Sequence, residues 1–197
     1  MIAILKYNAG NIRSVENAIK NLGFECIITD NPAELERASR VIFPGVGEAS
    51  SAMQYLKERG LDILLKSLTQ PLLGICLGQQ LMCKHSEEGD TECLGIFDTQ
   101  VKKFPPTEIV PHMGWNNLHS LKGYLFQNIN PAHDDVYFVH SYYSEICINS
   151  IATCDYILPF SAALQKDNFY ATQFHPEKSG DVGEQILRNF LALSLTD

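Results

Sequence analysis

Residues 71–82, PLLGICLGQQLM, constrain the fold more than any other stretch of the sequence. A short apolar run ends at Cys76, and the pattern G-I-C-L-G at 74–78 is the cysteine counterpart of the G-x-S-x-G turn between a strand and a helix. A Cβ at either glycine would collide with neighbouring backbone in so sharp a turn. The segment therefore predicts a strand over 72–75 and a helix beginning near Leu77. Cys76 would then lie at the carboxyl end of a strand, where parallel sheets place their active sites.

The first half of the chain alternates short apolar runs with helical patterns. Strands are predicted over 1–5 (MIAIL), 24–29 (FECIIT), 40–45 (RVIFPG) and 72–75 (LLGI). A helical stripe between the first two strands consists of Val15, Ala18, Ile19 and Leu22, with Ser14 as its predicted N-cap and Gly23 at its end. Helical patterns also cover 32–38 and 53–68, and Gly60 interrupts the second. This order predicts an α/β protein with a parallel sheet covered by helices.

The second half has strand-like runs without helices between them. They lie at 96–104, 108–118, 134–143 and 161–176, and they predict antiparallel strands that extend or flank the sheet. An amphipathic pattern at 183–193 predicts a closing helix with a buried stripe of Ile186, Leu187, Phe190 and Leu191. No linker or internal repeat divides the sequence, so we expect one domain over 1–197.

Charge and composition exclude several classes of partner. The chain carries 23 acidic and 15 basic residues, a formal charge of −8, without a block of basic residues, so nucleic acid is not an expected partner. The apolar runs are too short to cross a membrane, and the N-terminal run MIAIL ends at Lys6, so we expect a cytoplasmic protein. The six cysteines form no CxxC pair and the histidines no HxxxH or HExxH pair, so neither disulfides nor a metal site is predicted.

A reactive cysteine needs a base, and the segment YATQFHPEKSG supplies the best candidate. His175 ends an apolar run and Glu177 follows two residues later. A carboxylate on one imidazole nitrogen fixes the tautomer, which leaves the other nitrogen to accept the thiol proton. The alternative is a buried structural thiol and a partly buried histidine beside a surface glutamate. The spacing of Cys76 and His175 does not decide between these two interpretations.

Three motifs together resemble the class I (triad) glutamine amidotransferases. They are GICLGQQ at 74–80, FHPEKS at 174–179, and FPGVG at 43–47, which follows a strand where that family keeps its oxyanion loop. The resemblance implies a flavodoxin-like three-layer sandwich, with a mostly parallel central sheet and helices on both faces. It also implies hydrolysis of the side-chain amide of L-glutamine to glutamate and ammonia, without a cofactor.

Further segments look like the glutaminase subunits of imidazole glycerol phosphate synthases, which serve histidine biosynthesis. These segments are YNAGNIRSV at 7–15, PHMGWN at 111–116 and YFVHSYY at 137–143. The likeness implies a heterodimer with a (β/α)₈ cyclase subunit, which would use the ammonia to make imidazole glycerol phosphate and AICAR. The chain departs from this pattern at Lys6, where the family commonly has an acidic or small residue.

The resemblance also implies a role for each matched residue. The catalytic triad would be Cys76, His175 and Glu177, and the oxyanion hole would use backbone N–H groups of Leu77, Gly45 and Val46. Glutamine would be bound by Gln80, Glu88, His140, Ser141 and Tyr142. The partner subunit would be contacted by Asn11, Trp115, Tyr137 and Lys178. Glycines on both sides of Val46 make a peptide flip in this loop sterically feasible, so we expect the partner's substrate to drive residues 44–47 into their active form.

Three alternatives remain at this point. The chain could be the glutaminase subunit of another synthase, for anthranilate or pyridoxal phosphate, although PGVG and PHMGWN count against this. It could be a stand-alone cysteine hydrolase or chaperone with a similar elbow, which the HPE motif and Gln80 disfavour. A non-catalytic binding subunit is disfavoured by the intact Cys76, His175 and Glu177.

Overall fold

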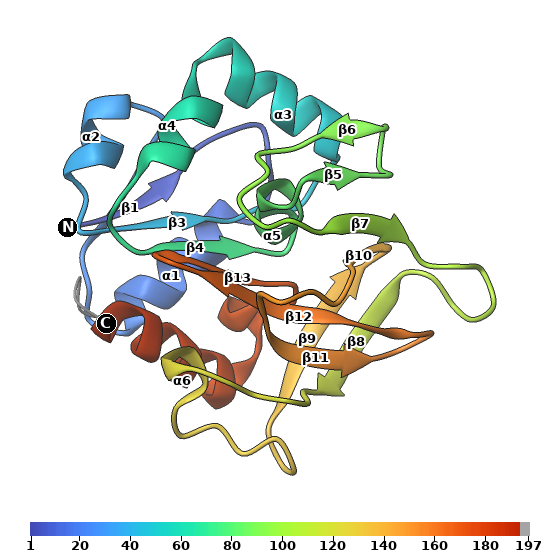
Figure 1. The fold of residues 1–197 in the computed structure, drawn as a ribbon. Coiled ribbons are helices and arrows are strands. Elements are labelled where there is room, and N and C mark those ends of the chain that lie inside the picture. The colour runs from blue at the N-terminus through green and yellow to red at the C-terminus, as the bar shows by residue number, and fades with distance from the viewer. Residues whose placement is uncertain (194–197) are drawn as a thin grey trace.

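The computed structural model describes residues 1–193 (Figure 1). Within them, the largest sheet has seven strands in the order β11-β12-β13-β4-β3-β1-β2. Its parallel part consists of β1 (Ile2–Leu5), β2 (Cys26–Thr29), β3 (Arg40–Phe43), β4 (Leu72–Ile75) and β13 (Phe169–Thr172). Two antiparallel strands, β12 (Pro159–Lys166) and β11 (Ser150–Asp155), extend one edge. The predicted mainly parallel α/β sheet with antiparallel additions is confirmed. The prediction of antiparallel strands over 161–176 is wrong in one respect, because β13 in this run pairs in parallel with β4.

Helices cover both faces of this sheet, which makes three layers (Figure 1). One face carries α1 (Ile12–Asn21) and α6 (Gly180–Ala192), and the other carries α2 (Pro32–Arg37), α3 (Ala49–Glu58), α4 (Leu61–Ser67) and α5 (Leu77–Met82). The side chains of β1 alternate between the two cores: Ile2 and Ile4 pack beneath α1, whereas Ala3 and Leu5 pack on the opposite side. Burial on both faces explains why this strand is an unbroken apolar run.

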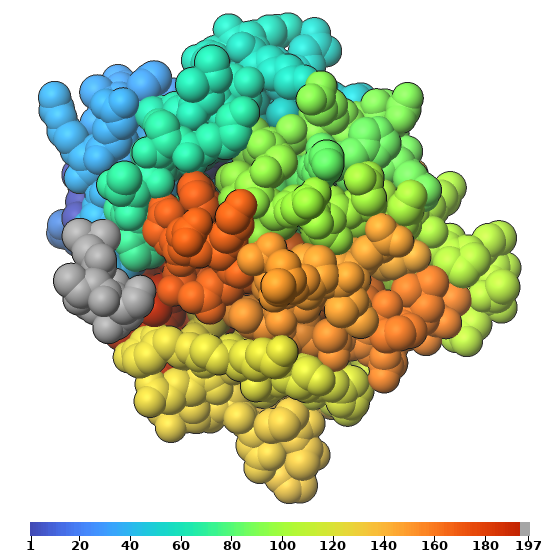
Figure 2. Space-filling view, viewed as in Figure 1, coloured from blue at the N-terminus to red at the C-terminus, as the bar shows by residue number. Residues whose placement is uncertain are grey.

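Two smaller sheets are formed by strands between residues 85 and 144. One joins β10 (Tyr142–Ser144), β7 (Gln100–Lys103), β5 (His85–Ser86) and β6 (Thr91–Glu92), and the other pairs β8 (His112–Asn117) with β9 (Asp135–His140). Short 3-10 turns lie at Tyr124–Phe126 and Pro176–Lys178. In the space-filling view, the orange segments lie against the teal and green ones, and the yellow segments lie below the orange (Figure 2). The sequence did not predict β5, β6 or β11.

The predicted start of α1 is wrong. The helix begins at Ile12 after Asn11, which has a left-handed backbone (φ 69°), and Ser14 lies inside the first turn. Asparagine tolerates this conformation better than most residues, so the chain turns into the helix three residues earlier than the Ser14 cap would place it. The end is as expected, since Gly23 has φ 87° and its N–H bonds to the Lys20 carbonyl.

The carboxyl ends of four parallel strands meet at one edge of the large sheet. Residues 6–11 follow β1, residues 44–47 follow β3, Cys76 follows β4, and residues 173–177 follow β13. This convergence brings the predicted site segments together, although they are far apart in sequence. Across residues 1–193, the helices are all too short or too polar to cross a membrane.

Candidate active site

Cys76 occupies a strained turn between β4 and α5. Its backbone has φ 54° and ψ −105°, a conformation that residues other than glycine rarely adopt. Its N–H donates to the Thr172 carbonyl at 2.7 Å. Close approach of the helix to β3 makes Gly78 necessary, because a Cβ there would lie 2.0 Å from the Phe43 carbonyl oxygen. The turn predicted from the glycine spacing is therefore present, and it presents the thiol at the strand end.

His175 and Glu177 form a buried pair beside this turn. Nδ1 of His175 lies 2.7 Å from Oε1 of Glu177, and both side chains have no exposed area. The amide of Asn11 donates to the same carboxylate oxygen. Tyr137 fixes the histidine backbone, because its carbonyl accepts the His175 N–H at 2.9 Å. The pair is held on both sides, so the imidazole presents Nε2 in a fixed orientation.

The charge state of His175 follows from its neighbours. Burial alone would lower the pKa of His175, but negative charge on Cys76 and the hydrogen-bonded Glu177 raise it to about 10. Nε2 is buried and makes no hydrogen bond of ordinary geometry to any residue of 1–193. Nδ1 is occupied by Glu177, so Nε2 is the ring nitrogen that remains to accept a proton.

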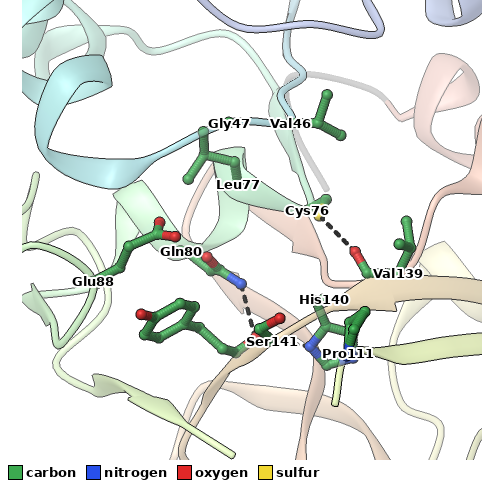
Figure 3. A pocket seen from close by; sticks show the side chains of 11 residues that line it. Val46, Gly47, Cys76, Leu77, Gln80, Glu88, Pro111, Val139, His140 and Ser141 are labelled. Atoms are coloured by element: carbon green, nitrogen blue, oxygen red, sulfur yellow. Dashed lines mark hydrogen bonds between the residues drawn. The ribbon is translucent and has the colours of Figure 1, made fainter. Parts of the chain in front are cut away.

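A cavity of about 260 Å³ opens in front of Cys76 (Figure 3). It is lined by Val46, Gly47, Cys76, Leu77, Gln80, Glu88, Pro111, Val139, His140, Ser141 and Tyr142. All the residues that the sequence assigned to glutamine binding are in this set. Burial raises the pKa of the Glu88 carboxyl, although the Ala49 N–H donates to it at 2.9 Å. The cavity thus offers a carboxylate and an amide opposite the thiol, as an amino acid substrate requires.

The predicted oxyanion loop, residues 44–47, hydrogen-bonds to one of the predicted oxyanion donors. The Leu77 N–H donates to the Gly45 carbonyl at 3.2 Å, and the Val46 carbonyl accepts from the Gly10 N–H at 3.0 Å. The hydroxyl of Tyr7, which the sequence analysis missed, donates to the Pro44 carbonyl at 2.7 Å. The Leu77 N–H, predicted from the sequence to stabilise an oxyanion, is therefore occupied by the Gly45 carbonyl in this structure.

Two buried histidines support the far wall of the cavity. Nδ1 of His112 lies 3.0 Å from Nε2 of His140, and Nδ1 of His140 lies 2.7 Å from the Tyr142 carbonyl. Burial lowers the pKa of His112 to about 4. Burial, together with the charges of His112 and His175, lowers the pKa of His140 to about 3, against the raising effect of its bond to the Tyr142 carbonyl.

These histidines should make the fold sensitive to acid. The unfolded chain binds a proton at each near pH 6.5, whereas the folded chain does so only near pH 4 or below, so the free energy of unfolding falls as pH drops below 6.5. In urea unfolding, we expect His140→Gln to lose about 1–2 kcal/mol less stability than the parent between pH 7 and pH 5. His85→Gln, at a partly exposed histidine, is the control; equal losses in His140→Gln and the parent would contradict the assignment.

The residues assigned to the partner interface divide into two groups. Trp115 lies on β8 and Tyr137 on β9, and the centroids of their rings are 5.9 Å apart. The ammonium nitrogen of Lys178 lies 5.9 Å from the centroid of the Tyr137 ring. Trp115 is 57% exposed and its neighbour Met113 is 63% exposed, so this strand presents an apolar surface. Asn11 is separate, since its amide points to Glu177.

A family model for class-I glutamine amidotransferases matches residues 3–193. The chain belongs to the class-I glutamine amidotransferase family. It is 60% identical over 195 residues to the imidazole glycerol phosphate synthase subunit HisH of Bacteroides fragilis (strain YCH46), covering 98% of this chain and 99% of that one. The corresponding subunit of Bacteroides thetaiotaomicron is 58% identical with the same coverage, and subunit HisH 2 of Legionella pneumophila (strain Paris) is 47% identical over both full lengths.

Solved structures of amidotransferases share the fold. A glutamine amidotransferase crystal structure superposes with a TM-score of 0.76 at 20% identity and covers 96% of both chains. The structure of PurLQS from Thermotoga maritima gives a TM-score of 0.71 at 16% identity, again over 96% of both chains. The resemblance seen in the motifs therefore extends over the whole architecture.

Proposed function

We propose that the chain hydrolyses L-glutamine to glutamate and ammonia and delivers the ammonia to a cyclase subunit that makes imidazole glycerol phosphate and AICAR. The observation that carries this proposal is the buried His175–Glu177 pair beside the strained Cys76 turn, at the mouth of an amino-acid-sized cavity. Family membership and the HisH relatives support the substrate and the pathway. The cytoplasmic location expected from the sequence is part of the same proposal.

The geometry supports a two-step mechanism. Cys76 transfers its proton to Nε2 of His175, and the thiolate attacks the side-chain amide carbon of glutamine. His175 then gives the proton to the departing ammonia, which leaves a glutamyl thioester. Water, activated by the same Nε2, cleaves the thioester and releases glutamate. Glu177 holds the imidazole in one tautomer through Nδ1 and stabilises its protonated form.

The closed oxyanion loop supports control by the partner. The Leu77 N–H becomes available only if the Gly45–Val46 peptide turns its carbonyl away, which would also bring the Val46 N–H toward the cavity. A missing oxyanion donor costs about 2.7–4 kcal/mol of transition-state stabilisation, or about 100- to 1000-fold in rate. The exposed Trp115–Tyr137–Lys178 surface is a suitable contact for the partner, because Tyr137 also holds the backbone of His175.

Glutamate release measured in three mixtures tests the proposal. The purified chain alone, with a (β/α)₈ cyclase, and with cyclase plus its nucleotide substrate should give low, intermediate and high rates. Strong activity with an anthranilate or pyridoxal phosphate synthase instead would assign the chain to another synthase. High activity of the chain alone on amides other than glutamine would favour a stand-alone hydrolase.

Removing the Tyr7 hydroxyl should loosen the closed loop. Any side chain at position 45 would meet that hydroxyl, since a Cβ at Gly45 would lie 1.9 Å from it, so Tyr7 is the cleaner position to change. A buried hydrogen bond contributes about 1 kcal/mol, so Tyr7→Phe should raise glutamate release by the chain alone about 5-fold. Tyr55→Phe removes a hydroxyl bonded to Asp30 and serves as the control. An unchanged basal rate in Tyr7→Phe would show that the hydroxyl does not hold the closed state.

A further inference from the structure

A buried glutamine contacts the sulfur of Cys76. Gln173 lies between the end of β13 and His175, has no exposed area, and places its Nε2 3.6 Å from Sγ of Cys76. Its Oε1 accepts from Nε2 of Gln80 at 3.0 Å, and its backbone N–H bonds to the Ala162 carbonyl at 2.8 Å. The side chain therefore lies directly between the sulfur and a residue that lines the cavity.

The orientation of both amides follows from a backbone carbonyl. The Tyr142 carbonyl can only accept, so the Gln80 atom 2.9 Å from it must be the NH₂ group. The same NH₂ faces Gln173, which must therefore present its oxygen to Gln80 and its own NH₂ to the sulfur. The direction of the N–H···S contact is thus fixed by the network, independently of how either amide is assigned alone.

From this network we infer that Gln173 is a catalytic residue of the proposed glutaminase, whose amide N–H donates to Cys76 Sγ and favours the thiolate. A donor to sulfur stabilises the anion more than the neutral thiol. A second polar contact of the sulfur works in the opposite direction, because the Val139 carbonyl, 3.9 Å away, accepts the S–H of the thiol. When the S–H bond breaks and the proton moves to Nε2 of His175, the Gln173 donor remains in place for the negative charge.

The same arrangement couples the cavity to the nucleophile. Nε2 of Gln80 is used by the Tyr142 and Gln173 oxygens, so Oε1 is the Gln80 atom left to face a substrate donor. A substrate N–H that binds Oε1 polarises the Gln80 amide and strengthens its bond to Gln173, which in turn strengthens the donor at sulfur. Gln173 therefore connects glutamine binding to thiolate formation.

The test follows the pH dependence of Cys76 alkylation in the isolated chain without glutamine. Iodoacetamide is added at each pH, and modification of the peptide that contains Cys76 is quantified by mass spectrometry. Gln173→Met keeps the length of the side chain but has no donor, so its alkylation midpoint should rise by about one pH unit. Gln173→Glu, which places a carboxylate beside the sulfur, should raise the midpoint further. Glutamate release with partner and nucleotide should fall about 10-fold in Gln173→Met.

Gln70→Met is the matched control. Gln70 is also a buried glutamine with one hydrogen bond to a backbone carbonyl, that of Leu35, and it lies at the opposite end of β4. If Gln173→Met does not fold, Gln173→Asn keeps a polar amide but withdraws it from the sulfur, with the same expected direction. A folded variant whose midpoint equals that of the parent would overturn the inference. Because the alkylation needs no substrate, this result is independent of whether the parent chain hydrolyses glutamine.

Discussion

Replacing Cys76 with alanine is expected to abolish glutamate release, by about 10⁴-fold or more, with partner and nucleotide present. The reason is chemical, since the proposed reaction passes through a thioester and Cys76 is the one thiol among the residues that line the cavity. Glutamate release is measured by a coupled assay at saturating glutamine. The variant should still bind glutamine, because Gln80 and Glu88 remain in the cavity wall.

Cys154→Ala is the control for this variant. Cys154 is buried on an edge strand, and burial raises its pKa to about 12, so it stays a neutral thiol. Its removal should leave glutamate release within a few-fold of the parent. Retained activity in Cys76→Ala, or equal losses in both variants, would remove Cys76 from the role of nucleophile.

Replacing Glu177 with glutamine is expected to lower kcat by about 10²- to 10⁴-fold. Glutamine at this position has nearly the same shape, but its NH₂ can donate to Nδ1 of His175 and so favour the wrong tautomer. The carboxylate also raises the pKa of His175, so its loss should move that pKa downward. His175 would then lose its proton at a lower pH. The fall of kcat on the alkaline side of the pH profile should therefore also shift to lower pH.

A neighbouring glutamate controls for the loss of negative charge. Glu184 on α6 forms an exposed ion pair with Arg188 at 2.7 Å. Glu184→Gln should leave the pH profile of kcat in place. A Glu177→Gln enzyme with normal kcat and an unmoved alkaline limb would show that the His175–Glu177 bond has no part in catalysis.

Features carried by local pattern could be predicted from the sequence. The glycines around Cys76 predicted the strand-to-helix turn, and the apolar runs predicted the parallel strands of the first half. The motif FHPE pointed to His175 and Glu177, which the structure joins at 2.7 Å. In each case the signal lies within a few residues, so no knowledge of distant contacts was needed.

Features that depend on contacts between distant segments could not be predicted. The amide of Asn11 reaches Glu177 across 166 positions, and Gln173 reaches Cys76 across 97. Their only sequence signals are a polar residue next to a glycine and a polar residue inside the apolar run YATQFH. The state of the oxyanion loop was likewise hidden, because it depends on hydrogen bonds from Tyr7 and Gly10 to residues 44–46.

The most direct test of the central claim is a search for the glutamyl thioester on Cys76. The chain, activated by partner and nucleotide, is mixed with glutamine, quenched in acid within milliseconds, digested, and analysed by mass spectrometry. We predict one glutamyl group on the peptide that contains Cys76, absent from Cys76→Ala and from samples without glutamine. Glutamate release without this adduct, or with an adduct on a different residue, would contradict the assignment of Cys76 as the nucleophile.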